Sequence, residues 1–229
     1  MNSKQRLISK VLSPAVRLWL RAQVQQVSDL EVKIWGSDRQ ILSGHIERVS
    51  ISGRHAVYQG LHLTQMQLVG EGIRVNLAAV LRGKPLRLLD PVPVFAELLL
   101  QELDLNTSLQ SPLLANALTE LLLKLLPATC PVDGTLSWHK ISIDSGQLIL
   151  NATLAGKSDN PTPVLIRTGL KLASSHELQL ENLQIQNDLG FSLGNLASFN
   201  LDLGPEVDIQ ELTLQHGQLV CSGRIKIMP

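Results

Sequence analysis

Aromatic residues are scarce in this chain of 229 residues, where Phe, Trp and Tyr together make up 3%. Proteins that hold single-stranded nucleic acid stack the bases on aromatic side chains and follow the phosphates with a positive groove. The formal net charge is zero at pH 7, so no overall field attracts polyanions. Nucleic acid is therefore not an expected partner.

Cysteine is nearly absent as well. Cys130 and Cys221 are the two in the chain, and they fit neither a disulfide framework nor a cysteine-rich zinc site. We expect both to be buried free thiols. The six histidines are scattered at spacings that suit no metal site. The sequence thus predicts no metal and no cofactor.

Long apolar runs are also missing. No stretch reaches the roughly 18 apolar residues of a transmembrane helix. The N-terminus is basic, but Pro14, Arg17 and Arg21 interrupt what would be the apolar core of a signal peptide. We expect neither a transmembrane helix nor a cleaved export signal.

Acidic residues are absent before Asp29. Residues 1–28 are predicted to be a basic amphipathic helix, broken once by a proline. Its second piece, residues 14–27, carries an apolar stripe formed by Val16, Leu20, Val24 and Val27. Two interpretations stay open. The helix lies on an anionic membrane surface through Arg17, Trp19 and Arg21, or it packs on the rest of the protein with its charges in water.

A second helix is predicted over residues 111–126, opened by Ser111 as N-cap and Pro112 at the first helical position. Leucines cover more than half of its circumference, which is more than a surface helix needs. The face is either simple core or part of an acyl-chain cavity. The candidate tail-binding residues are Leu113, Leu114, Ala117, Leu118, Leu121, Leu122 and Leu125.

Most of the remaining chain alternates apolar and polar residues with a period of two, which predicts strands. One signature occurs three times, with two adjacent polar residues in the middle of the alternation. The extra polar residue shifts the phase, so each copy predicts a bulge. The predicted strands are 30–34, 46–51, 94–100, 135–143, 148–154 and 164–172, and the three copies are 61–68, 178–185 and 207–214.

The fold class that follows is α+β: a long, curved, mainly antiparallel sheet wrapped around the leucine-rich helix. Residues 29–229 would form this single domain, after the N-terminal helix. Such a wrap leaves an elongated apolar groove.

Enzyme signatures are mostly missing, including the Gly-x-Ser-x-Gly elbow and the His-Glu-x-x-His pair. Glu97, Glu102 and Asp104 are carboxylates that could do acid–base work if they faced each other across a pocket. A simpler interpretation is that they lie on a solvent-exposed face. The chain is therefore not expected to be an enzyme.

Three motifs in the middle of the chain carry a family resemblance: Gly70-Glu-Gly-Ile-Arg-Val-Asn76, Leu81-Arg-Gly-Lys-Pro-Leu-Arg87, and Asp104-Leu-Asn106 followed by Leu109-Gln-Ser-Pro-Leu-Leu114. With them, the chain resembles the LmeA-like family of phospholipid-binding proteins, and most closely its cyanobacterial branch. The resemblance implies a fold akin to tubular lipid-binding proteins, phospholipid binding and a role in membrane maintenance. Exported members begin with a signal or anchor, so a location in the cytoplasm or on the cytoplasmic face of a membrane is expected here.

Three functions remain open from the sequence. The first is a non-enzymatic phospholipid or acyl-lipid binder. The second is a scaffold whose leucine face binds a protein partner, and the third is an enzyme using the carboxylates above. For the first, the candidates for contact with the lipid head group are Arg74, Arg82, Lys84 and Arg87.

Overall fold

The computed structural model of the protein describes residues 16, 18, 24–125, 135–144, 146–155, 161–187 and 192–229. The helices are α2 (Asp38–Leu42), α3 (Leu77–Val80), α4 (Glu102–Ser108) and α5 (Pro112–Leu125). The strands are β1 (Gln26–Trp35), β2 (His45–Tyr58), β3 (Leu61–Arg74), β4 (Val92–Gln101), β5 (Thr135–Asp144), β6 (Gln147–Ala155), β7 (Thr162–Ser174), β8 (Glu177–Asn187), β9 (Ser192–Asp202), β10 (Val207–Gln215) and β11 (Gln218–Ile227).

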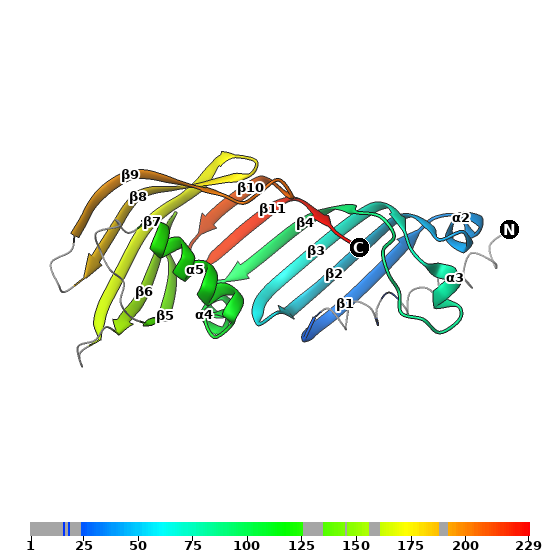
Figure 1. The fold of residues 1–229 in the computed structure, drawn as a ribbon, viewed down its shortest axis with the longest axis horizontal. Coiled ribbons are helices and arrows are strands. Elements are labelled where there is room, and N and C mark those ends of the chain that lie inside the picture. Colours follow the sequence, from blue (N-terminus) through cyan, green and yellow to red (C-terminus); the bar gives the residue numbers. More distant parts are fainter. Residues whose placement is uncertain are drawn as a thin grey trace.

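These strands form two antiparallel sheets. The first has six strands in the order β1-β2-β3-β4-β11-β10, and the second has five in the order β5-β6-β7-β8-β9. The sheets follow one another along the long axis of an elongated molecule (Figure 1). The prediction of a mainly antiparallel fold is confirmed, whereas the prediction of one continuous sheet is wrong.

The last hairpin of the chain completes the first sheet. β11 pairs with β4, so that Leu219 lies opposite Leu100 and Cys221 lies opposite Leu98. Because this pairing joins segments more than a hundred residues apart, the alternation within either strand carries no information about it. In the sequence, the five strands of the second sheet lie between β4 and β10 of the first sheet.

Two of the three predicted bulges are present. In β10 the pairing with β11 shifts between Ile209 and Glu211. In β8 the shift occurs around Asn182, whose φ is +50°. In both strands the register shift falls at the two adjacent polar residues, where the alternation of apolar and polar residues changes phase.

The bulge predicted in β3 is absent. The pairing of β3 with β2 keeps one register from Tyr58 to His45. At the phase change Thr64 instead lies buried on the core face. Its hydroxyl donates to the Asp104 carboxylate and accepts from the backbone N–H of Gln101 at 2.8 Å. A satisfied polar side chain on the core face thus replaces the bulge.

Gly223 permits the bulge in β10. A Cβ atom there would lie 2.5 Å from the Asp208 carbonyl oxygen and 2.7 Å from Cα of Ile209. We expect Gly223→Ala to destabilise the protein by about 1–3 kcal/mol, as overpacking does, in urea unfolding. Gly169→Ala is the control, because its nearest contact is 3.5 Å. Equal unfolding midpoints for the two variants would contradict this account.

The apolar interior has two parts. The larger core joins α4 and α5 to the five-stranded sheet and its buried members are Leu100, Leu105, Leu109, Leu122, Leu125, Trp138, Ile141, Ile143, Leu150, Ala152, Val164, Ile166, Leu180, Leu183, Ile185 and Leu214. The smaller core lies at the α2 and α3 end of the six-stranded sheet and its buried members are Val16, Val32, Ile41, Ile46, Val49, Ile73, Val75, Leu77, Leu86, Val92 and Val94.

The N-terminal helix ends earlier than predicted. Val16 and Leu18 are helical, but β1 begins at Gln26 and pairs with β2, so the helix does not reach residue 27. Val16 is buried in the smaller core. At this position the segment packs on the domain.

Candidate functional site

α5 is held over the five-stranded sheet by hydrogen bonds as well as by leucines. Ser111 directly precedes the helix, and its hydroxyl accepts from the backbone N–H of Leu114 at 3.2 Å. Trp138 on β5 donates its indole N–H to the Thr119 hydroxyl at 3.1 Å, and that hydroxyl donates to the Ala115 carbonyl at 2.7 Å. A buried indole therefore has a partner on α5, which fixes the helix against the sheet.

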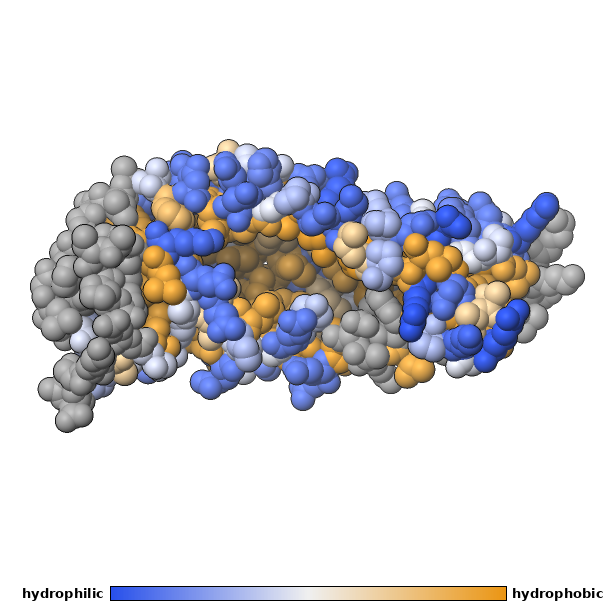
Figure 2. All heavy atoms as spheres, in the orientation of Figure 1, coloured by the Kyte–Doolittle hydropathy of each residue, from blue (hydrophilic) through white to orange (hydrophobic). Residues whose placement is uncertain are grey.

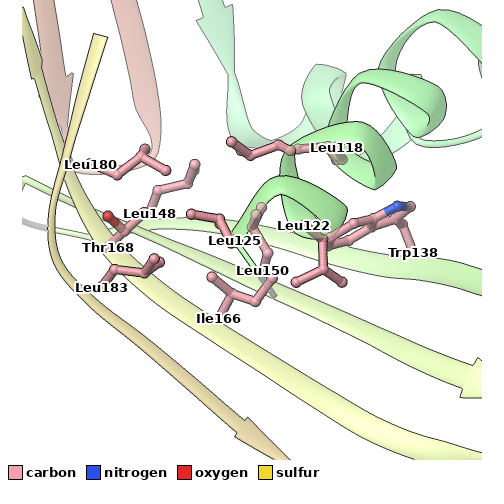
Figure 3. Close-up of a pocket in the computed structure, with 11 residues that line it drawn as sticks. Leu118, Leu122, Leu125, Trp138, Leu148, Leu150, Ile166, Thr168, Leu180 and Leu183 are labelled. Atoms are coloured by element: carbon pink, nitrogen blue, oxygen red, sulfur yellow. The ribbon is translucent and has the colours of Figure 1, made fainter. Parts of the chain in front are cut away.

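A pocket lies between α5 and the inner face of β5, β6, β7 and β8 (Figure 3). The space between its lining residues totals about 300 Å³ when the part open to solvent is counted, but the closed cavity is only about 20 Å³. We call it the leucine pocket, and it is lined by Leu118, Leu121, Leu122, Leu125, Trp138, Leu148, Leu150, Ile166, Thr168, Leu180 and Leu183. No charged side chain is among its lining residues, so it suits an apolar ligand.

The one hydroxyl in the lining already has acceptors. Thr168 is buried, and its Oγ1 lies 2.8 Å from the Gly169 carbonyl oxygen and 3.1 Å from that of Glu181. These carbonyls flank the bulge of β8. Because backbone groups take up this hydroxyl, the pocket offers a ligand almost no hydrogen bonding, and attraction within it is hydrophobic.

Beside the pocket, the apolar face of the six-stranded sheet continues the same surface. Register places Leu98, Cys221 and Leu212 in one row across β4, β11 and β10. Figure 2 shows a hydrophobic hollow beside α5, over these three strands. All three residues of the row are half-buried. We call this surface the trough floor.

Cys221 lies at the centre of the trough floor. It is a free, half-buried thiol, and burial raises its pKa above the ordinary value. The thiolate is therefore disfavoured, and the side chain behaves as a small apolar group with a weak donor. The expectation of a buried free thiol holds in part here, since the side chain is only half-buried; Cys130 lies outside the described residues.

The predicted tail-binding residues separate into two groups. Leu118, Leu121, Leu122 and Leu125 line the leucine pocket. Leu113 and Ala117 are exposed on the outer side of α5, and Leu114 is half-buried against the larger core outside the pocket. The structure thus brings together the C-terminal part of the predicted set.

The head-group candidates lie at the other end of the molecule from α5, around α3 (Figure 1). Arg74 pairs with Asp90, with 3.0 Å between Nη1 and Oδ2. Arg82, Lys84 and Arg87 are exposed on the loop that follows α3. None of the four lines the leucine pocket. The predicted tail and head-group residues therefore do not form one site.

Arg17, Trp19 and Arg21, the predicted membrane-surface residues, lie outside the described residues. The carboxylates named as acid–base candidates are described, and the structure separates them. Glu102 accepts the backbone N–H of Ile143 at 2.9 Å, and Asp104 accepts from Thr64. Glu97 is exposed. It lies on the opposite face of β4 from Leu98, so these carboxylates do not converge on a common pocket.

The sheet side of the leucine pocket was not predicted from the sequence. Its residues came from strands that were predicted, but alternation does not say which strand faces which helix. The missed lining residues are Trp138, Leu148, Leu150, Ile166, Thr168, Leu180 and Leu183. Trp138 gave the one usable signal, because a buried indole needs a hydrogen-bond acceptor and polar residues on the leucine helix are few.

Comparison with known proteins identifies the family. The model of LmeA-like phospholipid-binding proteins matches residues 4–224. Neither a curated protein nor a solved structure matches the chain. Across the part of the chain that the structure describes, no helix combines the length and apolar character needed to span a bilayer. Because the family match covers nearly the whole sequence, the chain belongs to the LmeA-like phospholipid-binding family.

Proposed function

We propose that this protein binds phospholipid without enzymatic activity, holding an acyl chain in the leucine pocket, and that it acts at or near a membrane. The observation that carries the proposal is the apolar lining of the pocket, whose single hydroxyl is already hydrogen-bonded. Burial of apolar groups contributes about 0.8 kcal/mol per CH₂. A chain of eight buried methylenes would therefore gain about 6 kcal/mol without any specific contact.

The trough floor extends the apolar surface that the same ligand could contact. Ligand pockets in proteins commonly enclose about 300–1,000 Å³, whereas the closed cavity of the leucine pocket is about 20 Å³, so its leucines would have to move apart to admit a chain. We infer that it takes the end of an acyl chain while the rest lies over Leu98, Cys221 and Leu212. Since no cation lines the pocket, the protein would select lipids by their chains more than by their head groups.

Mass spectrometry of the purified protein tests this function. The protein would be purified from cells, passed through gel filtration and extracted with organic solvent. We expect stoichiometric phospholipid in the extract, with more than one head group represented. A folded protein without lipid would contradict the proposal.

The alternative is a scaffold that binds a protein partner through α5. Leu113 and Leu123 support it, because both are exposed on the outer side of this helix. A lipid-free protein whose mass in solution rises with concentration, and stays monomeric after Leu123→Ser, would favour the scaffold.

A further inference from the structure

The end of the molecule that carries α2 and α3 exposes several leucines. Leu42 is 57% exposed, Leu81 is 59% exposed and Leu89 is 49% exposed. A single exposed leucine is ordinary, but a group of them marks an interaction surface. Figure 2 shows hydrophobic and hydrophilic residues intermixed at this end.

The three leucines belong to one packed unit. Leu42 ends α2, and two residues later the Gly44 carbonyl accepts the N–H of Val75 at 2.8 Å. Leu81 is the C-cap of α3. The N–H of Leu89 donates to the Arg74 carbonyl at 2.9 Å. Beneath them lies the smaller core, which includes Ile41, Val75 and Leu77 of the same segments.

The loop between Leu81 and Leu89 is also held in place. The side-chain amide of Asn76 donates to the Pro85 carbonyl at 3.0 Å, and its oxygen accepts the N–H of Arg87 at 2.8 Å. Five consecutive residues, 81–85, are exposed on this loop. Leucine and cationic side chains are therefore presented to solvent from a fixed backbone.

The cations of this loop have no acidic partner among the described residues. Arg82, Lys84 and Arg87 are exposed and make no ion pair there. Among the acidic residues at this end, Asp90 and Glu71 are engaged with Arg74 and Arg48, at 3.0 Å and 3.8 Å, and Asp38 on α2 is followed by Arg39. The loop therefore presents uncompensated positive charge beside exposed leucines.

We propose that this surface docks the protein on an anionic lipid bilayer. We define the docking tip as Leu42, Leu81, Leu89, Arg82, Lys84 and Arg87. Leucines at the interface bury apolar area among the acyl chains while neighbouring cations pair with anionic head groups. The proposal rests on the proposed function, because a lipid-binding protein must meet the bilayer that supplies its ligand. It assigns three of the four predicted head-group residues, Arg82, Lys84 and Arg87, to the membrane surface instead of to the bound lipid.

The test is sedimentation with vesicles made of equal parts phosphatidylcholine and phosphatidylglycerol. One tip variant carries Arg82→Glu and Lys84→Glu. Its matched control carries Lys124→Glu and Lys140→Glu, because these two exposed cations lie on α5 and on β5 of the other sheet. Each cation near an anionic surface contributes about fivefold to binding, equivalent to about 1 kcal/mol. The tip variant should therefore bind at least about 25-fold more weakly, and the control should bind like the wild type.

A second pair tests the leucines. Leu42→Ser with Leu81→Ser should weaken vesicle binding about tenfold. Its control is Leu103→Ser with Leu123→Ser, which are exposed on α4 and α5. Wild-type binding to phosphatidylcholine alone should be weak, and high salt should reduce binding to the mixed vesicles.

The outcomes separate this proposal from the proposed function. Retained vesicle binding in both tip variants, or equal losses in the controls, would overturn the docking tip. If the wild-type protein does not bind vesicles but forms dimers, and the tip variants are monomeric, the tip is a protein interface instead. The amount of lipid extracted from the same preparations tests the leucine pocket separately. The tip variants should keep their lipid. If every preparation lacks lipid, only the proposed function of the pocket is contradicted.

Discussion

Filling the leucine pocket should empty the protein of lipid. In the double variant Leu118→Trp, Leu121→Trp, we expect co-purified phospholipid to fall roughly 100-fold. Both leucines are half-buried and line the pocket from α5. The larger indoles occupy space that an acyl chain would fill. Displacing about four methylenes removes about 3 kcal/mol of binding free energy.

The fold should tolerate this change. Overpacking costs about 1–3 kcal/mol, whereas domains are stable by about 5–15 kcal/mol, and these side chains can turn toward the pocket. Leu122→Glu would be a poorer test, because Leu122 is buried and a charge there costs far more.

Leu123→Trp is the matched control, since Leu123 lies on the exposed side of the same helix. It should retain the wild-type lipid content. Lipid is quantified by mass spectrometry of solvent extracts, and circular dichroism confirms that each variant is folded. If the double variant is folded and still carries the wild-type amount of phospholipid, the leucine pocket is not where the acyl chain lies.

Local structure was predictable where a single segment determines it. α5 begins at Pro112 as predicted, because its N-cap and first-turn proline are adjacent in sequence. Alternation likewise located β2, β4 and β7. The capping box formed by Ser37 and Gln40 at α2 was equally readable, but this short helix was missed.

The arrangement of the strands was not predictable, because it depends on contacts between distant segments. Nothing in the alternation of β4 distinguishes β11 from β5 as its neighbour. The phase change in β3 illustrates the same limit. A bulge and a buried, hydrogen-bonded Thr64 both satisfy the pattern, and the choice depends on Asp104, forty residues away.

The candidate site shares this limit. The leucine helix identified one wall of the pocket, and four of its predicted residues line it. The other wall comes from four strands of the second sheet. Charge was a poorer guide, because Arg82 and Lys84 were predicted near the lipid yet lie around α3, over the other sheet (Figure 1).

Loss of the Asn106 side chain should strongly destabilise the protein. We expect Asn106→Ala to reduce the free energy of unfolding by about 2–4 kcal/mol. Asn106 lies on α4, and its amide pairs with both backbone groups of Ile141 on the edge of the five-stranded sheet. The Ile141 N–H donates to Oδ1 at 2.9 Å, and Nδ2 donates to the Ile141 carbonyl at 2.7 Å. Ile141 is buried, so alanine would leave both groups without a partner.

The effect should be large because α4 connects the two sheets. On its other side, the Ser108 hydroxyl accepts the N–H of His62 on β3 at 2.8 Å. Asn106 thus acts as a substitute neighbour for the edge strand β5, from a helix anchored to the first sheet. Asn106→Asp should be no better than alanine, since a carboxylate would face the Ile141 carbonyl without a hydrogen to donate.

Urea unfolding followed by tryptophan fluorescence measures the loss, since Trp138 reports on the five-stranded sheet. Thr107→Ala is the control on the same helix, because its exposed hydroxyl bonds only to the Leu103 carbonyl. It should shift stability by less than about 0.5 kcal/mol. Were Asn106→Ala to unfold at the wild-type urea midpoint, α4 would not be holding the sheets together through this side chain. The larger core and the other hydrogen bonds at the junction, such as that from the Gly217 N–H to the Ile143 carbonyl at 3.0 Å, would then have to account for it.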